Sequence, residues 1–128
     1  MLKKSILVAV MALASSPAFA ALSDCSEPYP PAAVDGSTAT EDKMAAARKD
    51  VMTFISDSDS YQLCLNSQLV EMKRKAASEK DKDKQKIDPG IQAGVASKLD
   101  SNQKLKERVG AEYNTAVTAY NAKHPKTP

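Results

Sequence analysis

Residues 44–65, MAAARKDVMTFISDSDSYQLCL, decide the fold of this chain. Apolar or small side chains recur there every three or four residues, and the pattern continues to residue 76. The positions are Met44, Ala47, Val51, Phe54, Ile55, Ser58, Tyr61, Leu65, Leu69, Met72 and Ala76. This spacing is typical of one face of an amphipathic α-helix. We therefore expect one long helix from about residue 39 to about residue 82.

The weakest part of this predicted helix is residues 56–60, because Ser-Asp-Ser-Asp-Ser has poor helix propensity. The main apolar positions on both sides of it nevertheless lie within roughly 80° of one another at ~100° per residue. A loop of arbitrary length between two helices would not keep these positions on the same side of the helix axis. We expect a continuous helix, with a kink at the serines as the alternative. Thr38 with Glu41 three residues later predicts a capping box at its start.

A second helix is predicted to start at Asp88-Pro89-Gly90, an N-cap followed by proline at the first helical position. Apolar positions then recur at helical spacing until His124-Pro125: Ile91, Val95, Leu99, Asn102, Leu105, Val109, Tyr113, Ala116 and Tyr120. Two long helices joined by a short turn predict an all-α fold, an antiparallel two-helix hairpin. We expect helices over 39–82 and 89–121 within a hairpin of 38–121, a flexible tail over 122–128, and a second helix that reaches back to about Val51.

The N-terminal segment, positions 1–20, has the pattern of a secretory signal peptide. Lys3 and Lys4 precede an apolar run over positions 6–14, and Ala18-Phe19-Ala20 forms an A-x-A cleavage site. A retained membrane anchor would need about 20 apolar residues, and this run has about nine. We expect cleavage after Ala20 and a periplasmic or secreted bacterial protein without a membrane anchor. Lipid attachment at Cys25 is the less favoured alternative, because Asp24 stands where lipoprotein signals have Gly, Ala or Ser.

The charge balance argues against a nucleic-acid partner. The predicted signal segment contains two of the 18 Lys and Arg side chains and none of the 16 Asp and Glu side chains, so the segment from Ala21 onward has equal numbers of both signs. The basic run over positions 73–75 is flanked by Glu71 and Glu79, and no aromatic residue is interleaved for base stacking. We interpret this run as solvent-exposed hairpin surface.

The only two cysteines, Cys25 and Cys64, are expected to form a disulfide, because an exported chain folds in an oxidising compartment. A redox-active pair would need the C-x-x-C spacing, which is absent. Residues 21–37 form a strap rich in proline, with Pro28, Pro30 and Pro31, which favours an extended conformation. We expect the disulfide to hold this strap along the first helix.

The strap is predicted to run along the side of the helix that carries Cys64. We assign Met52, Leu63 and Val70 to that side, where Tyr29 and Val34 of the strap would cover secondary apolar surface.

Residues for catalysis or metal binding are sparse. The only histidine is His124, in the predicted tail, so a nucleophile would lack a base. Calcium loops starting at Asp57 or Asp81 fail because position 6 is Gln62 or Lys86 instead of glycine. We therefore predict no catalytic residue, no metal site, no cofactor and no enzymatic activity.

The segment from Cys25 to Leu65 resembles a known group of sequences. Its elements are Cys25, Pro28, Pro30-Pro31, residues 35–40 (Asp-Gly-Ser-Thr-Ala-Thr), Met44, Val51, Phe54-Ile55 and Tyr61-Gln62-Leu63-Cys64-Leu65. In this segment alone, the chain resembles a group of small uncharacterised secreted proteobacterial proteins. The resemblance implies export and an extended strap, but it implies no activity.

Amphipathic helices without a catalytic constellation predict a protein that acts by binding another protein or itself. The side of the first helix that carries Phe54, Tyr61 and Gln68 lies away from the predicted strap, so we expect it to be exposed and to contact a second hairpin in a homodimeric, antiparallel four-helix bundle. A strapped monomer and a contact with a different protein are the alternatives. The buried polar residues Ser58 and Asn102 would set the register. The alternative function is a holdase chaperone, since the shape resembles the helical tentacles of the periplasmic hairpin chaperone for outer-membrane proteins.

Overall fold

The computed structural model describes Leu22 and residues 24–126. In this part of the chain the elements are the helix α2 (Glu41–Ala77), the short 3₁₀ helix η1 (Lys82–Lys84) and the helix α3 (Pro89–Lys123), and there is no strand. The predicted all-α class is therefore confirmed. The predicted signal peptide, residues 1–20, lies outside the described residues.

The helix α2 begins two residues later than the capping box predicted. Thr40 is its N-cap, and the Thr40 hydroxyl accepts a hydrogen bond from the Lys43 N–H at 3.3 Å. The predicted cap, Thr38, belongs instead to a turn in which its N–H donates to the Asp35 carbonyl at 3.3 Å. The predicted capping box is wrong because this turn already uses the backbone of Thr38.

The helix is continuous through the serines, as predicted, but it ends at Ala77 and not at about residue 82. Ser58 is fully buried, so this residue of low helix propensity is held by tertiary packing. At the C-terminus the Ser78 hydroxyl donates to the Lys75 carbonyl at 2.7 Å. The charged residues 79–86 that follow have no apolar face to bury and form only η1.

The helix α3 starts as its sequence predicts. The Asp88 carboxylate accepts from the Gly90 N–H at 2.8 Å, and Pro89 occupies the first turn. At the other end the helix continues to Lys123, where the His124 N–H donates to the Tyr120 carbonyl at 3.0 Å. The His124 ring stacks on Tyr120 with 4.3 Å between centroids, so ordered structure continues past the predicted limit at residue 121.

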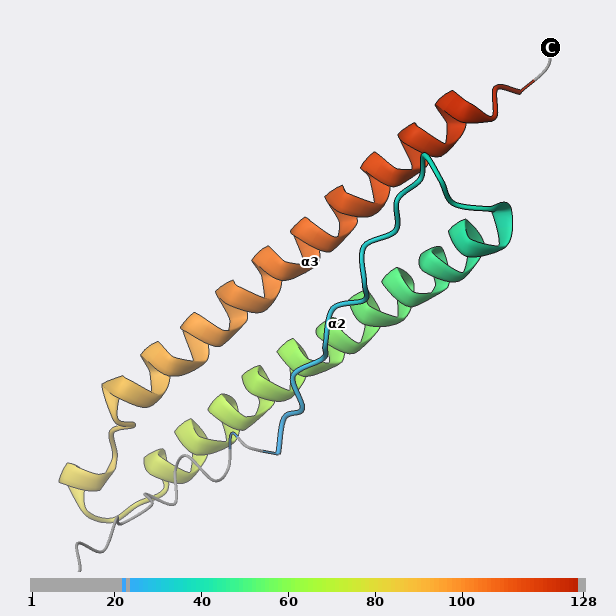
Figure 1. The fold of residues 1–128 in the computed structure, drawn as a ribbon. Helices are drawn as coiled ribbons and strands as arrows, with labels where there is room; N and C mark the ends of the chain where they lie inside the picture. The colour runs from blue at the N-terminus through green and yellow to red at the C-terminus, as the bar shows by residue number, and fades with distance from the viewer. Residues whose placement is uncertain (1–21, 23, 127–128) are drawn as a thin grey trace, which may run out of the picture.

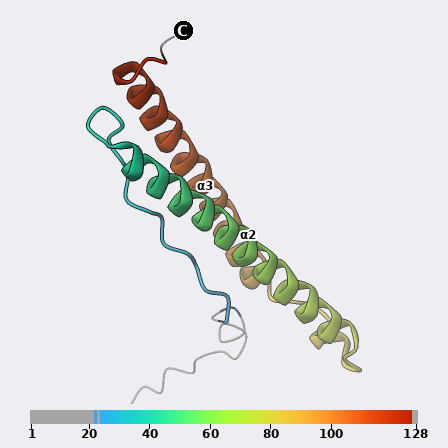
Figure 2. The ribbon, with the colours of Figure 1, turned by 90° about the vertical axis from the view of Figure 1, so that its right-hand side faces the viewer.

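The two long helices lie side by side and run in opposite directions (Figures 1 and 2). Ser58 and Gln62 of α2 hydrogen bond to Asn102 of α3, whereas Met44 near the start of α2 packs with Ala116 near the end of α3. The helix α3 therefore reaches farther back than Val51, the predicted limit. The reason is that α2 ends earlier than predicted, which shifts the pairing of the two helices.

The core is divided into two apolar clusters with a polar layer between them. Toward the η1 end, Tyr61 and Leu65 pack with Ile91 and Val95. Toward the opposite end, Ala39, Met44 and Ala116 are buried and are packed by Val34, Tyr113, Val117 and Tyr120. A pair of helices encloses its core on two sides only, so each cluster depends on a third element to cover it.

Candidate functional site

The third element is an extended segment, residues 25–35, which has no helix or strand and lies along the hairpin (Figure 1). Its residues 31–34 line a narrow recess together with Val51 of α2 and with Val109 and Tyr113 of α3. The segment therefore contacts both helices and lies over the groove between them. Its position divides the surface of α2 into a covered side and an uncovered side.

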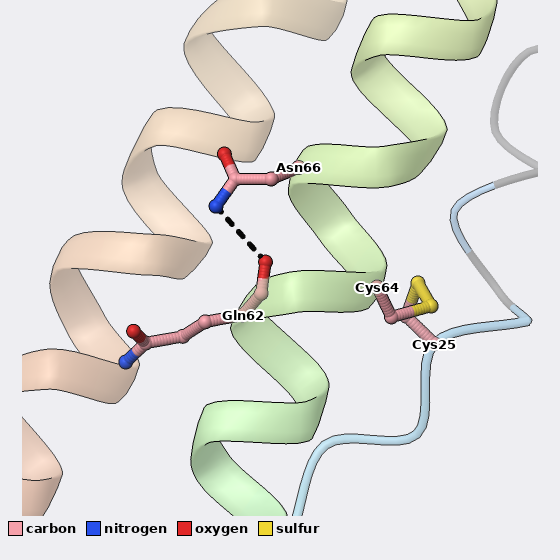
Figure 3. The surroundings of a disulfide bond; sticks show 4 residues. All are labelled: Cys25, Gln62, Cys64 and Asn66. Carbon is pink, nitrogen blue, oxygen red and sulfur yellow. Dashed lines mark hydrogen bonds between the residues drawn. A yellow bond between two sulfur atoms is a disulfide. The ribbon is translucent and has the colours of Figure 1, made fainter.

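A disulfide attaches the extended segment to α2 at one end. Cys25 and Cys64 are bonded, with 5.7 Å between their Cα atoms, as predicted from the cysteine count. Figure 3 shows Cys64 directed toward the extended segment, while Gln62, two positions earlier, points to α3. Cys25 is buried, and Leu22 packs beside it against Tyr61 and Leu65.

A glycine holds the other end of the segment against α3. Gly36 is buried, and a Cβ added to it would lie 1.7 Å from the backbone oxygen of Ala116. Only a residue without a side chain permits this approach. Sequence reasoning gave Gly36 no such role, because Ala116 is distant in the chain and the contact leaves no local signal.

The turn that presents Gly36 is organised by Asp35. The Asp35 carboxylate accepts from the Ser37 N–H at 2.9 Å and from the Ser37 hydroxyl at 2.6 Å. The hydrogen bond from the Ser37 side chain is the main cause of a lowered pKa for Asp35, and the bond from the Ser37 backbone adds to it. The turn is thus formed by local bonds at the protein surface.

The side of α2 that carries the disulfide, here called the closed flank, consists of Phe54, Tyr61 and Cys64. Phe54 and Tyr61 are each only 3% exposed, and Gln68 on the same side is half-buried. The prediction that Phe54, Tyr61 and Gln68 stay exposed for a second hairpin is therefore wrong. The reason is angular: Cys64 lies ~60° from Tyr61 but ~100° from Leu63 on a helix, so its disulfide draws the segment over Tyr61.

The opposite side of α2, here called the open flank, consists of Met52, Leu63 and Val70. These side chains are 58%, 68% and 64% exposed, although the strap was predicted to cover them. Tyr29, one of the two residues expected to cover them, is itself 94% exposed, and Val34 packs with the Ala116 cluster. Relative to the prediction, the two flanks of α2 have exchanged places.

Basic side chains border both ends of the open flank. Arg48 and Lys49 lie beside Met52 and line a shallow depression with it and with Asp57. At the other end Lys73 and Arg74 follow Val70. Arg74 binds Glu71 through two hydrogen bonds of 2.6 and 2.9 Å, which lower the pKa of Glu71 and raise that of Arg74.

Asp59, between these ends, is ion-paired with Lys106 of α3. Its negative charge is therefore partly compensated within the hairpin.

The polar layer between the helices consists of Ser58, Gln62 and Asn102. Ser58 and Asn102 are 0% exposed; Asn102 Nδ2 donates to the Ser58 hydroxyl at 3.3 Å, and Gln62 Nε2 donates to Asn102 Oδ1 at 2.8 Å. Each buried side-chain polar atom of the described residues has a partner. The predicted burial of Ser58 and Asn102 is confirmed, and their hydrogen bond joins α2 to α3 within the core.

Among the described residues there is no group of three or more His, Cys, Asp or Glu side chains placed to hold a metal ion. Comparison of the chain with protein-family models, with curated proteins and with solved structures gives no match. Neither long helix within residues 24–126 contains a stretch with the length and hydropathy needed to span a membrane.

Proposed function

We propose that this chain is an exported, non-enzymatic helical module that acts by binding another protein. The observation that carries the proposal is the open flank. All three of its large apolar side chains remain in solvent although the chain has an extended segment that covers other apolar surface. A row of exposed apolar side chains with polar borders is typical of a protein interaction surface.

In this proposal the working unit is an antiparallel hairpin clamped by a Pro-rich strap. The strap is attached covalently at Cys25 and sterically at Gly36, so it restrains both ends of the groove. A disulfide that closes a loop of this size contributes about 4 kcal/mol in the chain-entropy model. A rigid helix presents its side chains without an ordering cost on binding, which favours recognition.

Export is supported by the signal-peptide pattern of residues 1–20 and by the disulfide. We propose a periplasmic or secreted location and a mature N-terminus at Ala21. Intact mass of the protein recovered outside the cytoplasm tests this. A mass that includes residues 1–20, or a lipid adduct on Cys25, would contradict the proposal.

The protein-binding function is tested by site-specific photo-cross-linking in the cell, with mass spectrometry of the products. A photoreactive residue is placed at Leu63 on the open flank, at Tyr29 on the strap, or at Gln103 on α3. The proposal expects discrete protein adducts that are shared between replicate cultures. Absence of adducts from all three positions would overturn it.

A holdase chaperone would give a different result in two measurements. Its cross-links would spread over many unfolded clients, and the purified protein would suppress aggregation of an unfolded client at a stoichiometric ratio. The proposed module would cross-link to few partners and leave that aggregation unchanged.

A further inference from the structure

We propose that the open flank is the contact surface for a second copy of this chain, docked antiparallel along α2. The inference rests on the proposed protein-binding function and names the partner at the same site. It is carried by one alignment of the two helices, in which apolar side chains face apolar side chains and opposite charges meet at both ends.

The open flank belongs to a stripe of exposed residues that runs along almost the whole of α2. At ~100° per residue, Met52, Leu63 and Val70 lie within about 20° of one another, and their mean direction is here called the seam line. Exposed positions follow this line at alternating intervals of three and four residues: 42, 45, 49, 52, 56, 59, 63, 66, 70 and 73. This is the spacing of the contact positions in a coiled coil, so a second helix can follow α2 over nearly its full length.

The rest of the hairpin leaves room for a second helix on the seam line. Ser58 and Leu65, which pack against α3, lie about 125–145° from the line. Phe54 and Tyr61 on the closed flank lie about 165–175° from it. A second hairpin therefore approaches from a side that neither α3 nor the extended segment occupies.

One antiparallel register matches the side chains along this seam. With Met52 of one copy opposite Leu63 of the other, Ala45 lies opposite Val70, and twofold symmetry repeats both pairs. Each large apolar side chain of the open flank then faces an apolar side chain. The layers between them pair polar with polar side chains: Lys49 with Asn66, and Ser56 with Asp59.

Neighbouring alignments lose this match. A shift by seven residues in one direction places Val70 opposite residue 38, which precedes α2. The same shift in the other direction places Lys49 opposite Lys73. A parallel pairing in register places every charged residue opposite its own copy, and like charges at facing positions disfavour an interface.

Opposite charges meet at both ends of the proposed register. Glu41 in the first turn of α2 lies at the height of Arg74 near the end of the other copy, and both lie within about 35° of the seam line. Asp42 lies at the height of Lys73, and both lie within about 75° of the line. The helix dipoles add to this attraction, because the N-terminus of each α2 meets the C-terminus of the other.

The basic side chains in the middle of the seam do not oppose this register. Arg48 lies at the height of Ser67 of the other copy. Lys49 lies at the height of Asn66, so neither cation faces another cation. Asp57, which lines the depression beside them, points about 135° from the seam line and stays outside the contact.

Two acidic side chains near the seam already have partners within the hairpin. Asp59 lies near the twofold axis, where it approaches Asp59 of the other copy, and each is ion-paired with Lys106 of its own α3. Glu71 binds Arg74, whose guanidinium has further N–H donors for Glu41 of the other copy. The ion pair with Lys106 thus reduces the repulsion at the centre of the seam, and the end contacts stay intact.

The proposed contact is small, so the association is weak. Each copy contributes only three large apolar side chains, which places the contact among small, transient interfaces. We expect the protein to be monomeric at about 10 µM and dimeric near 1 mM. The open flank therefore remains in solvent at the low concentrations used to measure unfolding.

Sedimentation equilibrium measures the association. It uses the disulfide-bonded protein purified after expression of the full 128-residue chain, at about 10 µM to about 1 mM. We expect the mass to rise from one chain to two chains over this range. Dimerisation should weaken as salt rises from about 50 to about 500 mM, because salt screens the charges at both ends.

Carbodiimide cross-linking tests the register. The reagent joins a carboxylate to an amine that contacts it, so the dimer should give a link from Glu41 or Asp42 to Lys73. Residues 42 and 73 of one copy are about 46 Å apart along α2, so this link forms only between two copies. Mass spectrometry of the digested product identifies the linked peptides.

Exchange of the charges tests the end contacts. One variant combines Glu41→Lys with Asp42→Lys, and the other combines Lys73→Glu with Arg74→Glu. Each variant alone should dimerise about tenfold more weakly than wild type, because like charges then meet at both ends. An equimolar mixture of the two should associate about as strongly as wild type, because opposite charges meet again in the mixed dimer.

The apolar layer is tested at Leu63. Leu63→Gln should weaken dimerisation about tenfold, because an amide then replaces the apolar side chain opposite Met52 in both halves of the dimer. Tyr29→Gln is the matched control, since Tyr29 is 94% exposed but lies on the extended segment, away from the seam. It should leave dimerisation unchanged, and circular dichroism shows whether each variant is folded.

Several results would overturn the second-copy contact. They are a monomeric mass at every concentration, cross-links that join other positions without the pair to Lys73, and a mixture that associates no more strongly than its two components. A dimer that Leu63→Gln leaves unchanged also contradicts it. Binding to phosphatidylglycerol vesicles in place of self-association would assign the flank to a lipid surface and refute the proposal.

Photo-cross-linking from Leu63 in the cell separates this inference from the proposed function. An adduct that contains only peptides of this chain supports both. An adduct with a different protein, together with a monomeric mass of the purified chain, refutes the second-copy contact, while the proposed protein-binding function stands.

Discussion

The closed and open flanks belong to the same helix, and both carry large apolar side chains. Phe54 and Tyr61 on the closed flank are 3% exposed, whereas Met52 and Leu63 on the open flank are 58% and 68% exposed. Hydrophobicity alone does not separate them. Tyr61 on the closed flank is buried between α3 and the anchored extended segment, because it packs with Ile91 and Val95 of α3 and with Cys25, whereas the open flank faces solvent. The exposed surface of a long helix in a small protein thus depends both on its partner helix and on the segment that a disulfide attaches to it.

The largest contrast is expected between truncations on the two flanks. Phe54→Ala should lower the free energy of unfolding by ~3–5 kcal/mol, because it removes a buried ring and leaves a cavity. Leu63→Ala should change it by less than ~0.5 kcal/mol, since that side chain is already in solvent. Urea denaturation followed by circular dichroism measures both. Equal losses would show that the open flank is covered in solution.

Removal of the Cys25–Cys64 disulfide should reduce the difference in burial between the closed and the open flank. The double variant Cys25→Ser with Cys64→Ser should lose about 4 kcal/mol of stability in the chain-entropy model. Amide protons around Tyr61 should then exchange faster, while those around Leu63 change little. Hydrogen-exchange mass spectrometry at matched temperature compares the two regions. Two free thiols in the denatured, unreduced wild-type protein would contradict the disulfide itself.

The steric anchor is tested at Gly36. Gly36→Ala should destabilise the protein by ~1–3 kcal/mol, because the added methyl group meets the Ala116 backbone and the extended segment must shift. Gly94→Ala is the matched control: no atom lies within 4 Å of a Cβ there. It should stabilise the protein by ~1 kcal/mol through higher helix propensity. Thermal unfolding should show a lower midpoint temperature for Gly36→Ala and a higher one for Gly94→Ala. A stabilising effect of Gly36→Ala would contradict the steric contact between Gly36 and Ala116.

The polar layer should contribute less to the stability of the fold than the buried aromatic side chains of the closed flank. Asn102→Ala leaves the buried Ser58 hydroxyl without its partner and leaves the Gln62 amide only its 3.4 Å hydrogen bond to Gln103 Oε1, at a cost of ~1–3 kcal/mol. Gln103→Ala, next to it on the exposed surface, should lie within about 0.5 kcal/mol of wild type. Chemical denaturation compares them. Similar values for the two variants would mean that the layer does not fix the helix register.

The smallest expected effect concerns the Asp35 turn. Because the hydrogen bonds from Ser37 lower the pKa of Asp35, this carboxylate stabilises the fold above its ordinary pKa. The contribution is lost as the pH falls through the lowered folded-state pKa. A ¹³C NMR titration of Asp35 should show that depression, and Ser37→Ala should bring the pKa back toward its ordinary value. An unchanged titration in that variant would exclude Ser37 as the cause.

Most of the local structure was readable from the sequence by itself. The 3.6-residue period predicted two long helices, and the preserved phase predicted that α2 continues through its serines. Asp88-Pro89-Gly90 predicted the start of α3, and the cysteine count predicted the disulfide. These features depend on interactions between near neighbours or, for the disulfide, on there being only one way to pair two cysteines.

Tertiary structure alone decided which side of α2 is open. The choice depends on where the extended segment lies after Cys25 joins Cys64, and on the contact of Gly36 with the distant Ala116 of α3. Periodicity gives the angle of each side chain around its own helix, but not which neighbour will occupy that angle. The candidate site therefore could not be placed from the sequence: its residues were recognised as apolar, and their exposure followed from how a distant segment packs.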